Sequence, residues 1–180
     1  VLGVPRVVSI AAGVRTGAIE AVVGEGVPVV RVMPNTPSLV GEGAAAVAGG
    51  RAASDEDIEW AAGILSAVGE VVVVPEALLD AVTGLSGSGP AYVFLLAEAL
   101  MDAGEAEGLP REVAVALTEQ TLLGAATLLS RSDDPAATLR ENVTSAGGTT
   151  AAGLAVFEAG GFRQLVNDVV AAATERSRQL

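Results

Sequence analysis

The stretch TSAGGTTAAGL (residues 144–154) has the composition of an anion-binding helix start. The first backbone N–H groups of a helix have no partner within the helix and carry a partial positive charge, so they attract anions. Gly147 and Gly148 add no side-chain bulk there. A ligand carboxylate could therefore reach the amides of Gly148, Thr149 and Thr150. An ordinary threonine N-cap behind a flexible glycine entry explains the spacing equally well.

The hydroxyl groups of Ser145 and Thr150 accompany this helix start. The chain contains no histidine, cysteine or lysine, and all ten basic residues are arginine. This excludes imidazole catalysis, a Schiff-base lysine, a thiolate and a cysteine-based zinc site, and we predict no metal site. No histidine can activate Ser145 as an acyl nucleophile. An enzyme built from this chain would need a cofactor, and hydride transfer asks mainly for positioning from the protein.

Two small-residue segments follow apolar, strand-like runs and could border a cofactor. AAGV (residues 11–14) follows VVSI, and PNTP (residues 34–37) follows VVRVM. In an open α/β sheet, ligands bind beyond the carboxyl ends of the strands. Small side chains would admit a flat ring, and Asn35 and Thr36 could hydrogen-bond an amide or a ribose. Taken alone, both segments are more simply interpreted as turns.

Two further features lie near the middle of the chain. Glu76 is an isolated carboxylate which, taken alone, is best explained as a solvated acid at a helix start. The stretch DAVTGLSGSGPAY (residues 80–92) is dense in glycine and serine and predicts close backbone approach, either to another helix or to a ligand. By itself, it favours close packing at a helical dimer interface.

The elements that would position these residues change in type along the chain. Short β-branched runs predict buried strands, and helical spacing occurs between them. The predicted strands are 6–10, 27–33, 43–49 and 70–75, with helices at 14–24 and 54–68. Ser54 and Asp57 resemble a capping box at the second of these helices.

From residue 76 onward, only helices are predicted. They begin near Pro90, Pro110 and Pro135, and two more cover 149–158 and 161–178. The helix at Pro90 is apolar on nearly all sides, so we expect it to be buried between subunits. A composition shift near 75–80 marks a boundary between domains 1–75 and 76–180.

Composition limits the function further. A net charge of −12 argues against nucleic-acid binding, which needs a basic face. No uninterrupted apolar run approaches the roughly 18 residues of a membrane span, so we expect no membrane partner. No export signal is recognisable, which favours a cytoplasmic location. GEGAAA (residues 41–46) has dinucleotide-fingerprint spacing but precedes a predicted strand, whereas the fingerprint opens a helix.

The order of these motifs resembles the pyrroline-5-carboxylate reductase family. VTGLSGSGPAYVFLLAEALMDAG, GLPREVAVALTEQTLLGAATLL and VTSAGGTTAAGLAVFEAGGFRQLV are similar to its C-terminal region. SIAAGV and RVMPNTPSLVGEGAAAV resemble the second half of its cofactor domain. The resemblance implies a partial Rossmann-type α/β segment followed by an all-α dimerisation domain. We expect the family's N-terminal portion, with its Gly-rich dinucleotide turn, to be missing, and the chain has Ala146 where the family usually carries proline.

The resemblance also implies an activity and its residues. The family reduces the C=N bond of Δ1-pyrroline-5-carboxylate to L-proline with NADPH or NADH, the last step of proline biosynthesis. The implied roles are substrate binding by Ser145, Gly147, Gly148, Thr149 and Thr150, catalysis by Thr150 and Glu76, and cofactor binding by Ala11, Ala12, Gly13, Asn35, Thr36, Pro37 and Asn142. The family implies a homodimer through the helical domain, often built into decamers.

Two other interpretations stay open at this point. A hydroxyacid-dehydrogenase-like oxidoreductase also couples a nucleotide domain to a helical domain, but that type uses a catalytic lysine, which this chain lacks. The chain could instead be a non-catalytic dimerisation fragment. Nucleotide affinity would then be severely weakened.

Overall fold

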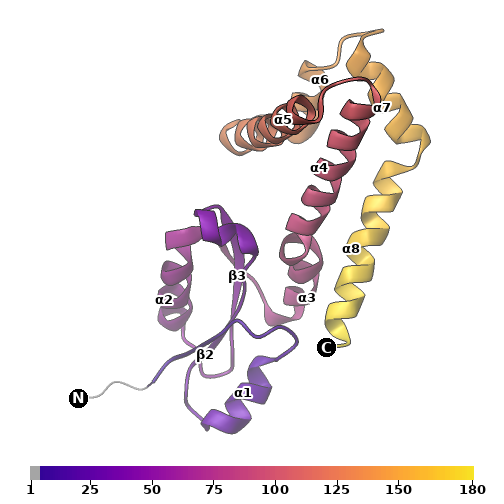
Figure 1. Cartoon of the computed structure of the whole chain (residues 1–180). Coiled ribbons are helices and arrows are strands. Elements are labelled where there is room, and N and C mark those ends of the chain that lie inside the picture. The colour runs from indigo at the N-terminus through magenta and orange to yellow at the C-terminus, as the bar shows by residue number, and fades with distance from the viewer. Residues whose placement is uncertain (1–4) are drawn as a thin grey trace. The chain divides into compact units, whose positions relative to one another are not determined.

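The computed structural model describes residues 5–180 as a four-stranded sheet followed by helices (Figure 1). The strands are β1 (Val7–Ser9), β2 (Val29–Met33), β3 (Gly43–Gly49) and β4 (Gly69–Val73). The α-helices are α1 (Thr16–Val23), α2 (Asp55–Leu65), α3 (Leu79–Val82), α4 (Gly89–Ala106), α5 (Arg111–Arg131), α6 (Ala136–Asn142), α7 (Thr149–Ala159) and α8 (Phe162–Arg178). Shorter turns of helix are η1 (Thr36–Val40), η2 (Ser66–Val68), η3 (Glu76–Leu78) and the π-helical η4 (Thr83–Gly87). The predicted fold class is confirmed. Residues 1–4, where the first predicted domain begins, lie outside the described residues.

The sheet has the order β1-β2-β3-β4. β1 and β2 are parallel, as are β3 and β4, whereas β2 and β3 run antiparallel. Because β1 and β2 are parallel neighbours, their carboxyl ends meet at one edge of the sheet. The segments beginning at Ile10 and Pro34 therefore leave the sheet on the same side. GEGAAA runs into β3 and opens no helix, as expected.

The two faces of the sheet pack against different hydrophobic cores, because alternate residues of a strand point to opposite faces. Val30 and Val32 pack with Val47 and with Ala61 of α2 on one face. On the other face, Ala46 and Ala48 of β3 pack with Leu79 of α3. Figure 1 shows α2 and α3 on opposite sides of the sheet. Burial on both faces, which the sequence predicts, holds for β2, but β4 is largely exposed.

The predicted capping box at the start of α2 is confirmed. The backbone N–H of Asp57 donates to Ser54 Oγ at 3.3 Å, and Asp57 Oδ2 accepts from the Ser54 backbone N–H at 2.9 Å. Arg6 adds an ion pair to Asp57 at 2.6 Å. This end of the helix is thus satisfied by side chains and complemented by negative charge.

The glycine-rich stretch is explained by two close approaches. A Cβ on Gly84 would collide with the hydroxyl of Thr174 and would lie 2.8 Å from the carbonyl oxygen of Val170, both in α8. A Cβ on Gly87 would lie 2.8 Å from the methyl carbon of Met33. Close backbone approach to another helix is therefore confirmed for Gly84, but that helix is α8 of the same chain, and the dimer interface favoured for this stretch stays a prediction.

The later helices expose much of their apolar surface. α4 contains no buried residue, and the side chains of Phe94 and Leu95 are 61% and 66% exposed. The expected burial of this helix between subunits stays a prediction, because the single chain leaves these side chains exposed and contains no partner. Within the part of the chain that the structure describes, α5 is long and apolar enough to span a membrane by length and composition. Thr118, Glu119 and Gln120 interrupt the apolar residues of α5, so the sequence contains no continuous apolar run of membrane-span length there.

The chain divides into two compact units. One comprises the residues up to Pro90 together with Asn167–Leu180, and the other is Ala91–Val166. We call the first the sheet unit and the second the helical unit. Residues 76–90 therefore belong to the sheet unit, whereas the predicted domain boundary lies near 75–80.

Candidate functional site

The start of α7, in the helical unit, shows why two glycines precede it. Gly147 adopts φ +70°, a left-handed conformation that L side chains rarely take. A Cβ on Gly148 would collide with Ser145 Oγ, and the Gly148 N–H donates to the Ser145 carbonyl at 3.0 Å. Gly147 is thus needed for backbone conformation, and Gly148 leaves room for a hydroxyl.

The same helix start offers exposed donors. Gly148 is the N-cap residue, and in the described chain no side chain caps α7. Ser145, Thr149 and Thr150 are exposed, and no hydrogen bond involves their hydroxyls among the described residues. Amides and hydroxyls therefore converge on one small, accessible surface. The interpretation of this stretch as an ordinary threonine N-cap is wrong, because a glycine occupies the N-cap position.

Asn142 ends α6, just before this loop. It is exposed, and the turn after it is closed by Thr144, whose hydroxyl donates to the Arg140 carbonyl at 2.6 Å. Asn142 thus lies in the same unit as Ser145 and Thr150. Its predicted cofactor contact stays a prediction.

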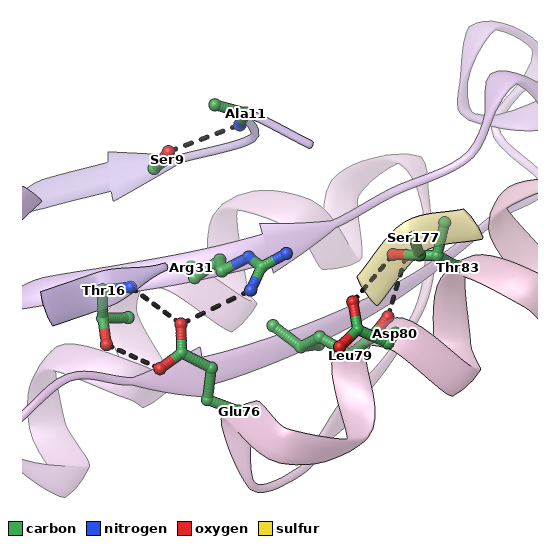
Figure 2. Close-up of polar contacts among 9 residues, drawn as sticks. All are labelled: Ser9, Ala11, Thr16, Arg31, Glu76, Leu79, Asp80, Thr83 and Ser177. Carbon is green, nitrogen blue, oxygen red and sulfur yellow. Dashed lines mark hydrogen bonds and ion pairs between the residues drawn. The ribbon is translucent and has the colours of Figure 1, made fainter. Parts of the chain in front are cut away.

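The two predicted cofactor segments lie in the sheet unit, at the shared carboxyl edge of β1 and β2. Ala11 and Ala12 are exposed, and the Ala11 N–H donates to Ser9 Oγ at 3.3 Å (Figure 2). Gly13 has φ +75°, and a Cβ there would lie 2.9 Å from the Leu180 Cβ. This turn is accessible, made of small residues and locally constrained.

Asn35 makes structural hydrogen bonds with both ends of its side-chain amide. Its Oδ1 accepts from the Ala44 N–H at 2.8 Å, and its Nδ2 donates to the Ser86 carbonyl at 3.0 Å. We had expected this amide to be available for an amide or a ribose. It instead joins the end of β2 to β3 and η4, and neighbouring Thr36 is the exposed polar side chain.

Glu76 is engaged by three donor groups (Figure 2). Its Oε1 accepts from the Thr16 N–H at 2.7 Å, and its Oε2 accepts from Thr16 Oγ1 at 2.8 Å. Arg31 Nη1 lies 3.5 Å from Oε1. Burial raises the pKa of the Glu76 carboxyl, but the bonds from Thr16 and the Arg31 charge outweigh it, so the net pKa is lowered. Glu76 does begin a short helix, η3, but its carboxylate is partly buried and hydrogen-bonded, so the interpretation as a solvated acid is wrong.

A cavity of about 870 Å³ in the sheet unit is bordered by several of these groups. Its lining includes Gly13, Thr16, Arg31, Glu76 and Ser177. The structure thus brings Glu76 and Gly13 to one cavity. The predicted substrate-binding residues, Ser145 and Gly147 to Thr150, lie in the helical unit instead.

Sequence reasoning missed most polar residues of this cavity, among them Arg31, Thr16 and Ser177. Arg31 is only 4% exposed within an otherwise apolar strand, and such a charge requires a partner. That requirement is a signal in VVRVM that could have directed attention to a carboxylate. Thr16 and Ser177 give no comparable signal. Ser177 Oγ donates to Asp80 Oδ1 at 2.7 Å, across 97 positions of sequence.

Comparison with known proteins gives consistent matches along the chain. Residues 76–180 match the family model described as pyrroline-5-carboxylate reductase dimerisation. The chain is 48% identical over 173 residues to the pyrroline-5-carboxylate reductase of Arabidopsis thaliana, covering 96% of this chain and 62% of that protein. It is also 48% identical over 179 residues to the Synechocystis enzyme, covering 98% of this chain and 66% of that one.

Solved structures agree with these sequence matches. A pyrroline-5-carboxylate reductase from Coxiella burnetii superposes with a TM-score of 0.94 at 42% identity, covering 97% of this chain and 65% of that one. The Plasmodium falciparum pyrroline carboxylate reductase, solved with NADP bound, gives a TM-score of 0.87 at 38% identity, covering 96% and 69%. The chain thus spans between 62% and 69% of these relatives' lengths.

Proposed function

Because the chain belongs to the pyrroline-5-carboxylate reductase family, we propose that it serves the NAD(P)H-dependent reduction of Δ1-pyrroline-5-carboxylate to L-proline, the last step of proline biosynthesis. The observation that carries the proposal is the start of α7. Exposed amides and the hydroxyls of Ser145 and Thr150 converge there without a side-chain cap. A small ligand with one carboxylate beside a ring nitrogen matches that arrangement.

The substrate carboxylate would be held by the amides of Thr149 and Thr150, because the predicted third donor, the Gly148 N–H, already donates to the Ser145 carbonyl at 3.0 Å. Helix N-termini attract anions through free N–H groups and the helix dipole. Ser145 Oγ, packed against Gly148, would add a donor on the same side. This anchoring would fix the orientation of the ring.

The ring nitrogen must gain a proton as the imine carbon is reduced. Without histidine, lysine or cysteine, a hydroxyl or a water has to deliver it. We assign this position to Thr150, whose hydroxyl makes no hydrogen bond within the described chain. Glu76 suits the step poorly, because its lowered pKa leaves it ionised near neutral pH and Thr16 occupies both of its oxygens.

The segment Ala11–Gly13 fits a nicotinamide ring. Two exposed alanines and a glycine at the carboxyl edge of two parallel strands permit close approach of a flat group. Bound NADPH or NADH would supply the hydride there. Thr36, Pro37 and Asn142 would complete the contacts with the cofactor, whereas Asn35 would hold the Thr36–Pro37 segment through its bonds to Ala44 and Ser86.

We further propose that the helical unit forms a homodimer. Exposed apolar side chains such as Phe94, Leu95 and Leu117 leave α4 and α5 without enough cover in the single chain. The match of residues 76–180 to a dimerisation family supports this proposal. Light scattering should give twice the 17.8 kDa chain mass, and a strictly monomeric chain would contradict the proposal. Assembly into decamers and a cytoplasmic location stay predictions.

A second candidate function is dimerisation without catalysis. The chain spans 62% of the Arabidopsis thaliana relative, so groups outside it could be required for nucleotide binding. A hydroxyacid-dehydrogenase-like activity finds no support in the comparisons and lacks its lysine. Ligand binding distinguishes the reductase from the non-catalytic dimer.

The test is calorimetric titration of the chain with L-proline near neutral pH. Saturable binding that is lost in Thr150→Ala, but kept in the exposed control Thr121→Ala, is the expected result. Undiminished binding by Thr150→Ala would remove its proposed role. Absence of binding by the wild type, with and without NADPH, would favour dimerisation alone.

A further inference from the structure

We propose that Glu76 is a positioning residue for the cofactor: it fixes the first turn of α1 and thereby the Ala11–Gly13 turn that precedes it. This inference rests on the proposed use of a nicotinamide cofactor. It assigns Glu76 a role that differs from proton transfer. Figure 2 shows the groups concerned.

Helix α1 has no side-chain cap from its own N-cap residue. Its N-cap residue, Arg15, makes no side-chain cap bond. The carboxylate of Glu76, 60 residues later, instead accepts from both the N–H and the hydroxyl of Thr16, at 2.7 and 2.8 Å. A carboxylate at this end satisfies a free donor and complements the helix dipole. Glu76 therefore acts as a cap supplied from outside the helix.

The buried guanidinium of Arg31 lies next to this cap. Arg31 is 4% exposed and lies in the middle of β2, and its Nη1 is 3.5 Å from Glu76 Oε1. No other hydrogen bond involves its guanidinium in the described structure. A buried guanidinium needs a counter-charge, and Glu76 provides it. The carboxylate is consequently held between a strand and a helix rather than free to swing.

The cap at Thr16 also constrains the Ala11–Gly13 turn, which directly precedes α1. Thr16 follows Gly13 by three residues, so the direction of this turn depends on where α1 begins. The other end of the turn is tied by the bond from the Ala11 N–H to Ser9 Oγ at 3.3 Å. The Cβ site of Gly13 is closed by Leu180. The segment between Ser9 and Thr16 is thus fixed at both ends, with Glu76 as the distant anchor.

The consequence is a specific kinetic pattern. Among the described residues, the hydrogen bonds and the ion pair of Glu76 join groups of the sheet unit, whereas the predicted carboxylate loop lies in the helical unit. Loosening Thr16 should therefore impair nucleotide binding and leave binding of the imine substrate unchanged.

The experiment compares Glu76→Gln, Thr16→Val and Thr16→Ser with the wild type. Glu76→Gln removes the charge, and Thr16→Val removes only the hydroxyl. We expect KM for NADPH to rise roughly 10- to 100-fold in Glu76→Gln, the size expected from leaving hydrogen-bonding groups without their charged partner, and less in Thr16→Val, while KM for pyrroline-5-carboxylate stays unchanged. Thr16→Ser should restore the wild-type value. Glu59→Gln, an exposed acid of α2, is the control.

Other outcomes would overturn the inference. A lower stability with an unchanged KM for NADPH would make the network merely structural. A decrease in kcat alone, with KM for NADPH unchanged, would indicate that Glu76 acts in proton transfer instead. If Glu76→Gln does not fold, the Thr16 pair decides the question. NADPH affinity is also measured directly by fluorescence titration. If the wild type binds NADPH without reducing the imine, the proposed function fails while the affinities still judge this inference, and a wild type that binds no NADPH overturns it.

Discussion

Ser145 Oγ fills the space that a Cβ on Gly148 would occupy. Two residues three positions apart thus share one small volume directly in front of α7. The hydroxyl can stay there only because residue 148 has no side chain. This relationship ties the geometry of the predicted carboxylate site to a single missing atom.

Gly148→Ala should therefore weaken L-proline binding without unfolding α7. The new methyl group displaces Ser145, and the loss of a hydrogen bond to a charged group corresponds to roughly 10- to 100-fold in affinity. Calorimetry measures the affinity, and far-UV circular dichroism measures the helix content. Gly153→Ala in the same helix is the control, since nothing lies within 4 Å of its Cβ site. Equal affinities in the two variants would contradict the prediction.

Gly84→Ala should destabilise the sheet unit. Its Cβ would meet the Thr174 hydroxyl and the Val170 carbonyl of α8, and overpacking typically costs about 1–3 kcal/mol. Urea denaturation measures the free energy of unfolding. Gly63→Ala in α2 has no atom within 4 Å and should instead be neutral or stabilising by roughly 0.5–1 kcal/mol. A neutral result for Gly84→Ala would show that α8 can shift freely.

Asn35→Ala should also lower the free energy of unfolding. The substitution leaves the Ala44 N–H and the Ser86 carbonyl without their partner, and each unsatisfied group costs about 1–3 kcal/mol when it is buried. The comparison variant is Asn167→Ala, which removes an exposed amide of α8. If both variants lose the same stability, Asn35 is not the structural link inferred here.

Stability should fall in acid partly through Asp57. Hydrogen bonds from Ser54, followed by the Arg6 charge, hold the pKa of Asp57 below its usual value. A carboxyl whose folded pKa is depressed stabilises the protein above its unfolded pKa, which is about 3.9, and this contribution is lost as pH falls through the folded value.

The variant Asp57→Asn tests this pH dependence. The stability difference between it and the wild type should be largest above about pH 5 and should shrink below about pH 4. A constant gap between wild type and Asp57→Asn over this range would refute the linkage.

The regular elements were predictable because their signals are local. Ser54 and Asp57 lie three residues apart, and the β2 pattern is continuous over five residues, so sequence spacing alone places both. The turn conformation at Gly147 belongs to the same class. What decides each of these features lies within one helical turn or one strand.

The candidate site was less predictable because its contacts join distant positions. Glu76 meets Thr16 and Arg31 across 60 and 45 residues, and no periodicity encodes that encounter. Asn35 has the chemistry of a ligand group, yet the fold uses both ends of its amide. For α4, apolarity on nearly all sides predicts cover from a second subunit, and the exposure of Phe94 and Leu95 in the single chain agrees with that need for cover.

The π-helical turn η4 sets the rotational phase of α4. A π-helical turn contains one residue more than an α-helical turn, and each α-helical residue advances about 100° around the axis. The bond from the Ser88 N–H to the Thr83 carbonyl at 2.8 Å closes this wider turn. Removing one residue between Thr83 and Gly87 would therefore turn Gly89 and Pro90, the first residues of α4, by about 100° relative to α3. One extra residue thus acts as an angular offset between the end of one helix and the start of the next.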